Sequence, residues 1–240
     1  MISSIKGRVI AAVCAALMVA APATAQVVGT PGAPSGFGLA GNVVAFSLSG
    51  SYGSKRGTGP QSTRYDASTS VVFGFGDPVD GIGLQIGANL TSFRKFGKSG
   101  FVTVGAHKMF QLSEAGIYSV ALNIDNIAPW GDSKKNKLSG NLIVSYMTGF
   151  GPQLGLVTVG VTNNTTPNRK LKPVFGISTG VTETSSVGFG HAGDTSTIGM
   201  TFAPQALQGA SISVAANRNW KTRQNGVTVD IGRAFALKGF

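Results

Sequence analysis

Large hydrophobic residues alternate with small polar residues along most of this chain. In the segment 43–52, the large side chains are Val44, Phe46, Leu48 and Tyr52, and serine occupies most of the positions between them. Successive side chains of a β-strand point to opposite faces, so this pattern predicts a strand with one apolar face and one small polar face. The same alternation recurs to the end of the chain.

Clusters of Gly, Pro, Asn, Asp and Ser divide the chain into twelve such segments. Most are close to the roughly 9 to 11 residues that a tilted strand needs to cross a bilayer. We predict strands at residues 42–53, 66–76, 82–93, 101–110, 117–125, 138–148, 155–163, 171–181, 186–191, 196–203, 210–220 and 227–237.

The connections between these segments also alternate. Those after even-numbered segments are compact, as at residues 77–81, whereas those after odd-numbered segments tend to be longer and basic. Short turns at one end and long loops at the other are typical of an outer-membrane barrel. The candidate basic rim comprises Lys55, Arg56, Arg64, Arg94, Lys95, Lys98, Lys134, Lys135, Lys137, Arg169, Lys170, Lys172, Arg218, Lys221 and Arg223.

The N-terminus has the order of a secretory signal. Lys6 and Arg8 precede an apolar run over residues 9–21, and Ala23-Thr24-Ala25 follows it. The run is shorter than the roughly 18 apolar residues of a membrane-spanning helix. We therefore predict a cleaved signal peptide at residues 1–25, and the single cysteine, Cys14, leaves with it.

Residues 26–41, which are rich in Gly and Pro, form an irregular lead-in to the predicted barrel at residues 42–240. The lead-in has two possible places: it can hang free, or it can fold into the barrel as a plug. Glycine is also frequent at the inward positions of the strands. Because glycine weakens a strand, this placement predicts either close approach of another backbone or an open lumen.

The whole chain has 20 Lys+Arg and 9 Asp+Glu, and removal of Lys6 and Arg8 leaves an excess of about nine positive charges. No aromatic-plus-basic motif of a nucleic-acid-binding protein accompanies this charge, so we expect no nucleic acid. The basic rim has two readings of equal weight. It either raises the local concentration of anions, or it binds lipid phosphates and keeps the rim solvated.

With its export signal, cysteine-free mature chain, alternating strands and terminal Phe240, the chain resembles bacterial outer-membrane β-barrels of the porin-like class, with no specific family identified. The resemblance covers residues 42–240 and implies an all-β fold, a closed antiparallel transmembrane β-barrel of about 12 strands. It also implies the outer membrane of a Gram-negative bacterium as location, and lipid and the barrel assembly machinery as partners. Lys238 departs from the usual terminal pattern, where an apolar residue is expected.

The favoured function is a passive channel for small hydrophilic solutes, anionic or neutral, with a mild anion preference. The alternatives are a non-conducting barrel that binds polysaccharide, lipid or a partner, and a secreted β-sandwich. Asp125 and Asp230 are candidates for a constriction, or for anchoring a loop. The candidate lumen residues are Gln85, Asn89, His107, Asn123, Asp125 and Asp230.

Two motifs resemble enzyme signatures. Residues 176–180 match G-x-S-x-G, but they lie inside a predicted strand rather than at a strand-to-helix turn. Residues 188–193 match G-x-G-x-x-G, but no helix follows them. The two histidines, His107 and His191, fall near opposite ends of the predicted barrel. We therefore predict no catalytic residues, no metal site and no cofactor.

Overall fold

The computed structural model describes residues 29–53, 65–93, 96–113, 116–150, 153–164, 170–204 and 209–237. The predicted signal peptide, its cleavage site, and Lys238 and Phe240 lie outside these residues. Within them, no helix is long and apolar enough to cross a membrane.

Twelve strands make up most of the described chain, and their ends agree with the sequence prediction to within three residues. A short 3₁₀ helix, η1 (Gly131–Lys135), lies between β5 and β6. The strands are β1 (Val43–Gly53), β2 (Tyr65–Gly76), β3 (Gly83–Leu90), β4 (Gly100–Ser113), β5 (Gly116–Asp125), β6 (Ser139–Phe150), β7 (Gln153–Thr162), β8 (Lys172–Thr182), β9 (Ser185–Ala192), β10 (Thr195–Phe202), β11 (Ala210–Asn219) and β12 (Gln224–Ala236).

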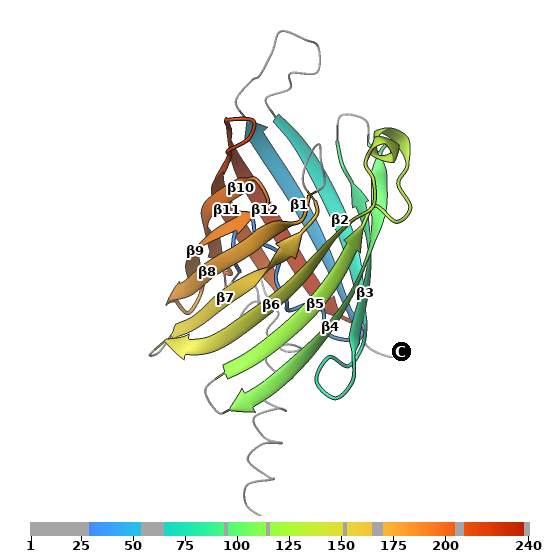
Figure 1. Ribbon diagram of the computed structural model, residues 1–240. Helices are drawn as coiled ribbons and strands as arrows, with labels where there is room; N and C mark the ends of the chain where they lie inside the picture. Colours follow the sequence, from blue (N-terminus) through green and yellow to red (C-terminus); the bar gives the residue numbers. More distant parts are fainter. Residues whose placement is uncertain are drawn as a thin grey trace, which may run out of the picture.

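All twelve strands belong to one closed antiparallel barrel (Figure 1). Each strand pairs with its neighbours in sequence, and β1 closes the sheet against β12 with Val43 opposite Ala236 and Gly53 opposite Gly226. Closure leaves no free sheet edge, which is how a sheet satisfies its backbone polar groups in lipid. The structure confirms the predicted barrel, and the β-sandwich alternative is wrong because there is one closed sheet rather than two packed sheets.

The outer face of the barrel is apolar. Ile86 is 43% exposed, and its cross-strand partners on the same face are Phe73 and Val104. Comparable residues on other strands include Leu122 and Ile198, at 49% and 63% exposure. A soluble protein rarely exposes a contiguous apolar surface of this kind, whereas a lipid-facing belt requires it.

The two ends of the barrel differ. Residues 126–138 at one end form a long connection that contains η1, whereas residues 77–82 at the other end form a compact turn (Figure 1). The connection between β9 and β10 is an exception on the long-loop side, because only Gly193 and Asp194 separate these strands. Near the short-turn end, the outward-facing Lys108 donates a hydrogen bond to the carbonyl oxygen of Val79 at 3.0 Å, so its ammonium group reaches out of the apolar belt.

Candidate functional site: the lumen and its N-terminal segment

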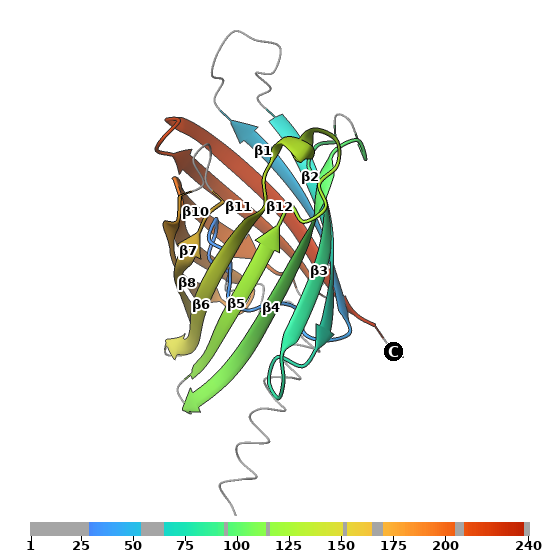
Figure 2. The ribbon, with the colours of Figure 1, turned by 45° about the vertical axis from the view of Figure 1, so that its right-hand side comes forward.

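Residues 29–41, which we call the lumenal segment, run inside the barrel before β1 begins (Figure 2). The segment starts with a β-turn in which the amide of Ala33 donates a hydrogen bond to the carbonyl oxygen of Thr30 at 3.1 Å. Pro31 takes the second position of this turn, and Gly32 takes the third with φ +70°. Proline followed by a residue of positive φ is the signature of a type II turn, so the sequence defines this conformation locally.

Glycines on β8 and β9 make room for this turn. A Cβ atom on Gly176 would lie 2.7 Å from the Cβ of Thr30, and one on Gly188 would lie 2.8 Å from the Cδ of Pro31. A Cβ atom on Gly190 would overlap the carbonyl oxygen of Pro31. At these three positions, therefore, the glycines permit close approach of another backbone.

The middle of the segment is held by hydrogen bonds to inward side chains. The amide of Gly36 donates to the hydroxyl of Ser145 at 2.8 Å, and the hydroxyl of Ser119 donates to the carbonyl oxygen of Gly36 at 2.6 Å. Ser119 and Ser145 are direct cross-strand partners on β5 and β6, and both are fully buried. Three residues later, the amide of Leu39 donates to the Oε1 atom of Gln85 at 3.3 Å. We call Ser119 and Ser145 the serine clamp.

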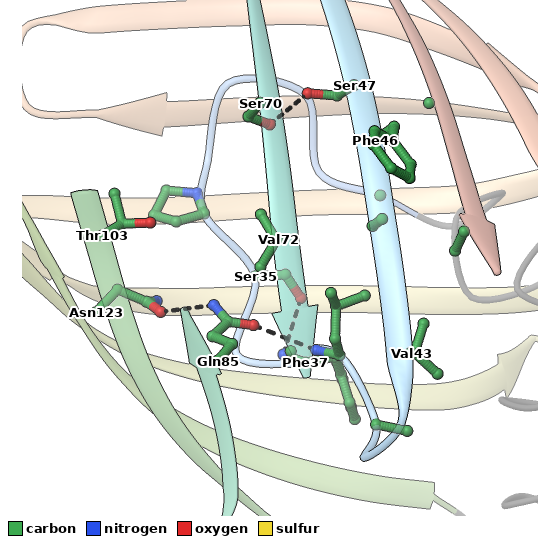
Figure 3. Close-up of a pocket in the computed structure, with 18 of the residues that line it drawn as sticks. Ser35, Phe37, Val43, Phe46, Ser47, Ser70, Val72, Gln85, Thr103 and Asn123 are labelled. Atoms are coloured by element: carbon green, nitrogen blue, oxygen red, sulfur yellow. Dashed lines mark hydrogen bonds between the residues drawn. The ribbon is translucent and has the colours of Figure 1, made fainter. Parts of the chain in front are cut away.

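On one side of the segment lies a cavity of about 650 Å³, which we call the amide cavity (Figure 3). Four carboxamide side chains and one carboxylate line it, together with serines, a threonine and apolar residues. The carboxamides and the carboxylate are Gln85, Asn89, Asn123, Asn141 and Asp125. A large cavity with a few convergent polar groups is the usual form of a small-molecule site.

On the other side lies a second cavity of about 510 Å³, between the turn at residues 29–32 and strands β10 to β12. Asn217 and Asp230 line this cavity, along with several threonines and serines. Both cavities thus place polar side chains on partly apolar walls, and the lumenal segment forms part of each.

Part of the inner wall is apolar. Ile143, Leu156 and Val174 point inward from β6, β7 and β8 and are 0%, 2% and 2% exposed. The expectation of a lumen lined throughout by small polar residues is wrong on this side, because the interior is packed there rather than open.

The predicted lumen residues all lie on the inner face. Five of them line the two cavities, whereas His107 is buried, at 3% exposure, between Gly38 of the lumenal segment and Gly83 of β3. Neither ring nitrogen of His107 has a hydrogen-bond partner in the described part of the chain. The role of each of these residues stays a prediction.

The rim residues that the structure describes lie at the long-loop end, in the connections or at the strand ends beside them. They are Lys98, Lys134, Lys135, Lys137, Lys170, Lys172, Arg218, Lys221 and Arg223, while Lys55, Arg56, Arg64, Arg94, Lys95 and Arg169 lie outside the described residues. Two of the described cations pair with acids: Lys172 with Asp194, and Lys135 with Asp132 at 3.4 Å. The net positive charge of this end is therefore smaller than the number of its cations.

The enzyme-like motifs lie in strands. Ser178 is an inward, buried residue in the middle of β8. His191 stacks on Phe175, with ring centroids 5.1 Å apart, and its Nδ1 atom lies 2.9 Å from the hydroxyl of Ser196. Among the described residues, no three His, Cys, Asp or Glu side chains form a group that could hold a metal ion.

The serine clamp was not predicted from the sequence, whereas the inward glycines were expected to permit either close approach of another backbone or an open lumen, and those beside the turn do the former. The local signal for an ordered lead-in was present, because Thr30-Pro31-Gly32 has the composition of a type II turn. A turn of defined shape, together with a row of inward glycines, indicates a docked segment better than a free one.

Comparison with solved structures supports the barrel. The KdgM porin matches with a TM-score of 0.51 and 8% sequence identity, over 79% of this chain and 99% of that one. A structure described as the KdgM porin in complex with disordered oligogalacturonate matches with a TM-score of 0.54 and 8% identity, over 80% and 99% of the two chains. No protein-family model matches this chain, and no curated protein is similar to it in sequence. At this level of identity, the likeness establishes the fold.

Proposed function

We propose that this protein is a passive channel for small hydrophilic solutes in the outer membrane of a Gram-negative bacterium. The observation that carries the proposal is a pair of cavities with polar side chains inside a closed barrel with an apolar outer belt, on either side of a segment that noncovalent contacts hold in the lumen. A twelve-stranded barrel lies between eight-stranded barrels, which side chains fill, and open porins of sixteen strands. Its solutes either diffuse past the lumenal segment or cross the barrel after this segment has been displaced.

The basic rim gives this channel a mild preference for anions. Arg218, Lys221 and Arg223 lie together around the connection of β11 and β12, where they attract anions to the mouth. The competing role for these cations is to bind phosphates of the surrounding lipid. Screening by salt distinguishes attraction of anions to the mouth from binding of lipid phosphates, because the Debye length falls from about 30 Å at 0.01 M salt to about 3 Å at 1 M. Steering of ions at the mouth should therefore weaken as salt is added.

The alternative is a non-conducting barrel whose basic loops bind surface polysaccharide, lipid or a partner. The docked lumenal segment favours it, because a close-packed turn and three hydrogen bonds between its backbone and inward side chains hold the segment across the lumen. In this reading, the segment is a permanent plug.

Planar-bilayer recording of residues 26–240, refolded in detergent, tests the proposal. We expect discrete conductance steps and a reversal potential that indicates anion preference at 0.01–0.1 M salt and a smaller preference at 1 M. The matched variant lacks residues 29–41 and should conduct more than the wild type. Insertion of the wild type without conductance, with conductance restored by the deletion, would instead establish the plugged barrel.

A further inference from the structure

We infer that the amide cavity is a binding site for uncharged, polyhydroxylated solutes, of the size of a di- or trisaccharide. The inference takes the channel function as its premise and names the class of solute that it selects. Its basis is the arrangement of carboxamides on β3, β5 and β6.

The carboxamides form a row across adjacent strands. Asn123 and Asn141 are direct cross-strand partners on β5 and β6, and both line the cavity. Gln85 reaches this row from β3, where its Nε2 atom donates to the Oδ1 atom of Asn123 at 3.0 Å (Figure 3). Gly105, which lies between them on β4, allows the contact, because a Cβ atom there would lie 2.9 Å from the Cγ of Gln85.

The polar side chains of this cavity differ in whether they already make hydrogen bonds within the protein. Gln85 binds both Asn123 and the backbone of Leu39, so it orders the wall of the cavity. Asn89, Asn141 and Asp125 make no side-chain hydrogen bond with any other described residue of the chain, and all three line the cavity. Their donors and acceptors are therefore available to a solute.

The chemistry of these free groups matches hydroxyl groups. A carboxamide offers both a donor and an acceptor, and an ionised carboxylate accepts hydrogen bonds, so each can bind a sugar hydroxyl. Phe37 and Met147 add apolar surface to the same cavity, against which the C–H faces of a sugar ring can pack.

The charge of the cavity excludes acidic sugars as its preferred ligand. No Lys or Arg is among the described residues that line the cavity, and its one charged group is the carboxylate of Asp125. An anionic saccharide would bring its carboxylate into this field without a cation to pair with, which is unfavourable in a partly desolvated site. Uncharged saccharides avoid this cost.

Isothermal titration calorimetry of the folded full-length mature barrel with maltotriose tests the site. We expect saturable binding by the wild type and about tenfold weaker binding by Asn141→Ala, because the variant loses one or two hydrogen bonds to the solute. Asn89→Ala gives a second, independent variant on β3, and Asn217→Ala is the matched control because Asn217 lines the other cavity. The heat-modifiable shift of the folded barrel on gels verifies that each variant is folded.

Trigalacturonate is the charged probe. We expect it to bind the wild type at least tenfold more weakly than maltotriose, and Asp125→Asn should narrow this difference. Binding of trigalacturonate as tight as that of maltotriose would overturn the inference, as would loss of maltotriose binding in Asn217→Ala alone. Conductance without any maltotriose binding would refute the site and leave the channel in place, whereas binding without conductance would refute the channel and support the site.

Discussion

The serine clamp should decide how often the lumenal segment leaves the lumen. Ser119 and Ser145 make two hydrogen bonds, at 2.6 Å and 2.8 Å, to the carbonyl and the amide of Gly36. A typical intramolecular hydrogen bond contributes about 0.5–1.5 kcal/mol to stability. Replacing both serines by alanine should therefore destabilise the docked segment by about 1–3 kcal/mol, which raises the ratio of undocked to docked protein roughly 5- to 150-fold.

Single-channel recording reports the undocked population, as the fraction of time that each channel spends in its highest conductance state. We expect this fraction to rise in the Ser119→Ala, Ser145→Ala double variant and to approach that of the variant lacking residues 29–41. The control is Ser213→Ala, because the hydroxyl of Ser213 lies 2.9 Å from that of Thr201, on the wall of the second cavity. The control should retain the wild-type fraction.

A specific result would refute this reasoning. If the double variant has the same open fraction as the wild type while the deletion variant is fully open, the clamp does not hold the segment. The turn against Gly176, Gly188 and Gly190 would then be the dominant contact.

Two further predictions concern the outer belt and the turn. Ile86→Arg should lower the free energy of unfolding in lipid vesicles by about 2–4 kcal/mol, whereas Ile82→Arg, in the turn just before β3, should cost about 0–1 kcal/mol. Equal stability of the two variants in denaturant titrations would argue against a lipid-facing β3. Gly190→Ala should displace Pro31 and speed amide hydrogen exchange in residues 29–41, because its Cβ atom would overlap the Pro31 carbonyl oxygen. Gly50→Ala is the control, since the nearest atom to its added Cβ lies 3.8 Å away, and equal exchange in both variants would contradict the docked turn.

The strands could be predicted from the sequence because each has one face that must be apolar. A shift of one residue would exchange the two faces, so the alternation identifies each strand and its inward side chains, while the turns also set which residues pair. The inward orientation of Ser119 and Ser145, which are partners across β5 and β6, follows from this alternation. Their contact with Gly36 does not follow, because an irregular segment has no period, and its path depends on the shape of the space that the closed sheet leaves.

The composition of the lumen could also be predicted only in part from the sequence. Inward positions were expected to be small and polar, yet Ile143, Leu156 and Val174 fill part of the interior. Their parity was readable from the strands, but alternation alone does not distinguish an inward apolar residue that packs from one that lines water. Only the closed barrel, with a segment inside it, identifies which inward positions are packed and which line a cavity.

Cationic side chains and neutral carboxamides occupy different parts of this barrel, so salt should affect ion preference and sugar binding differently. Cations gather at the mouth, where Lys172, the first residue of β8, is already paired with Asp194. The described walls of the amide cavity carry carboxamides and one carboxylate instead. Screening by salt weakens forces between separated charges, but it has little effect on hydrogen bonds made at contact. Ion preference should therefore decline with salt, while the affinity for maltotriose should stay nearly constant. A parallel decline of both would indicate that the cations of the mouth, rather than the amides of the cavity, bind the sugar.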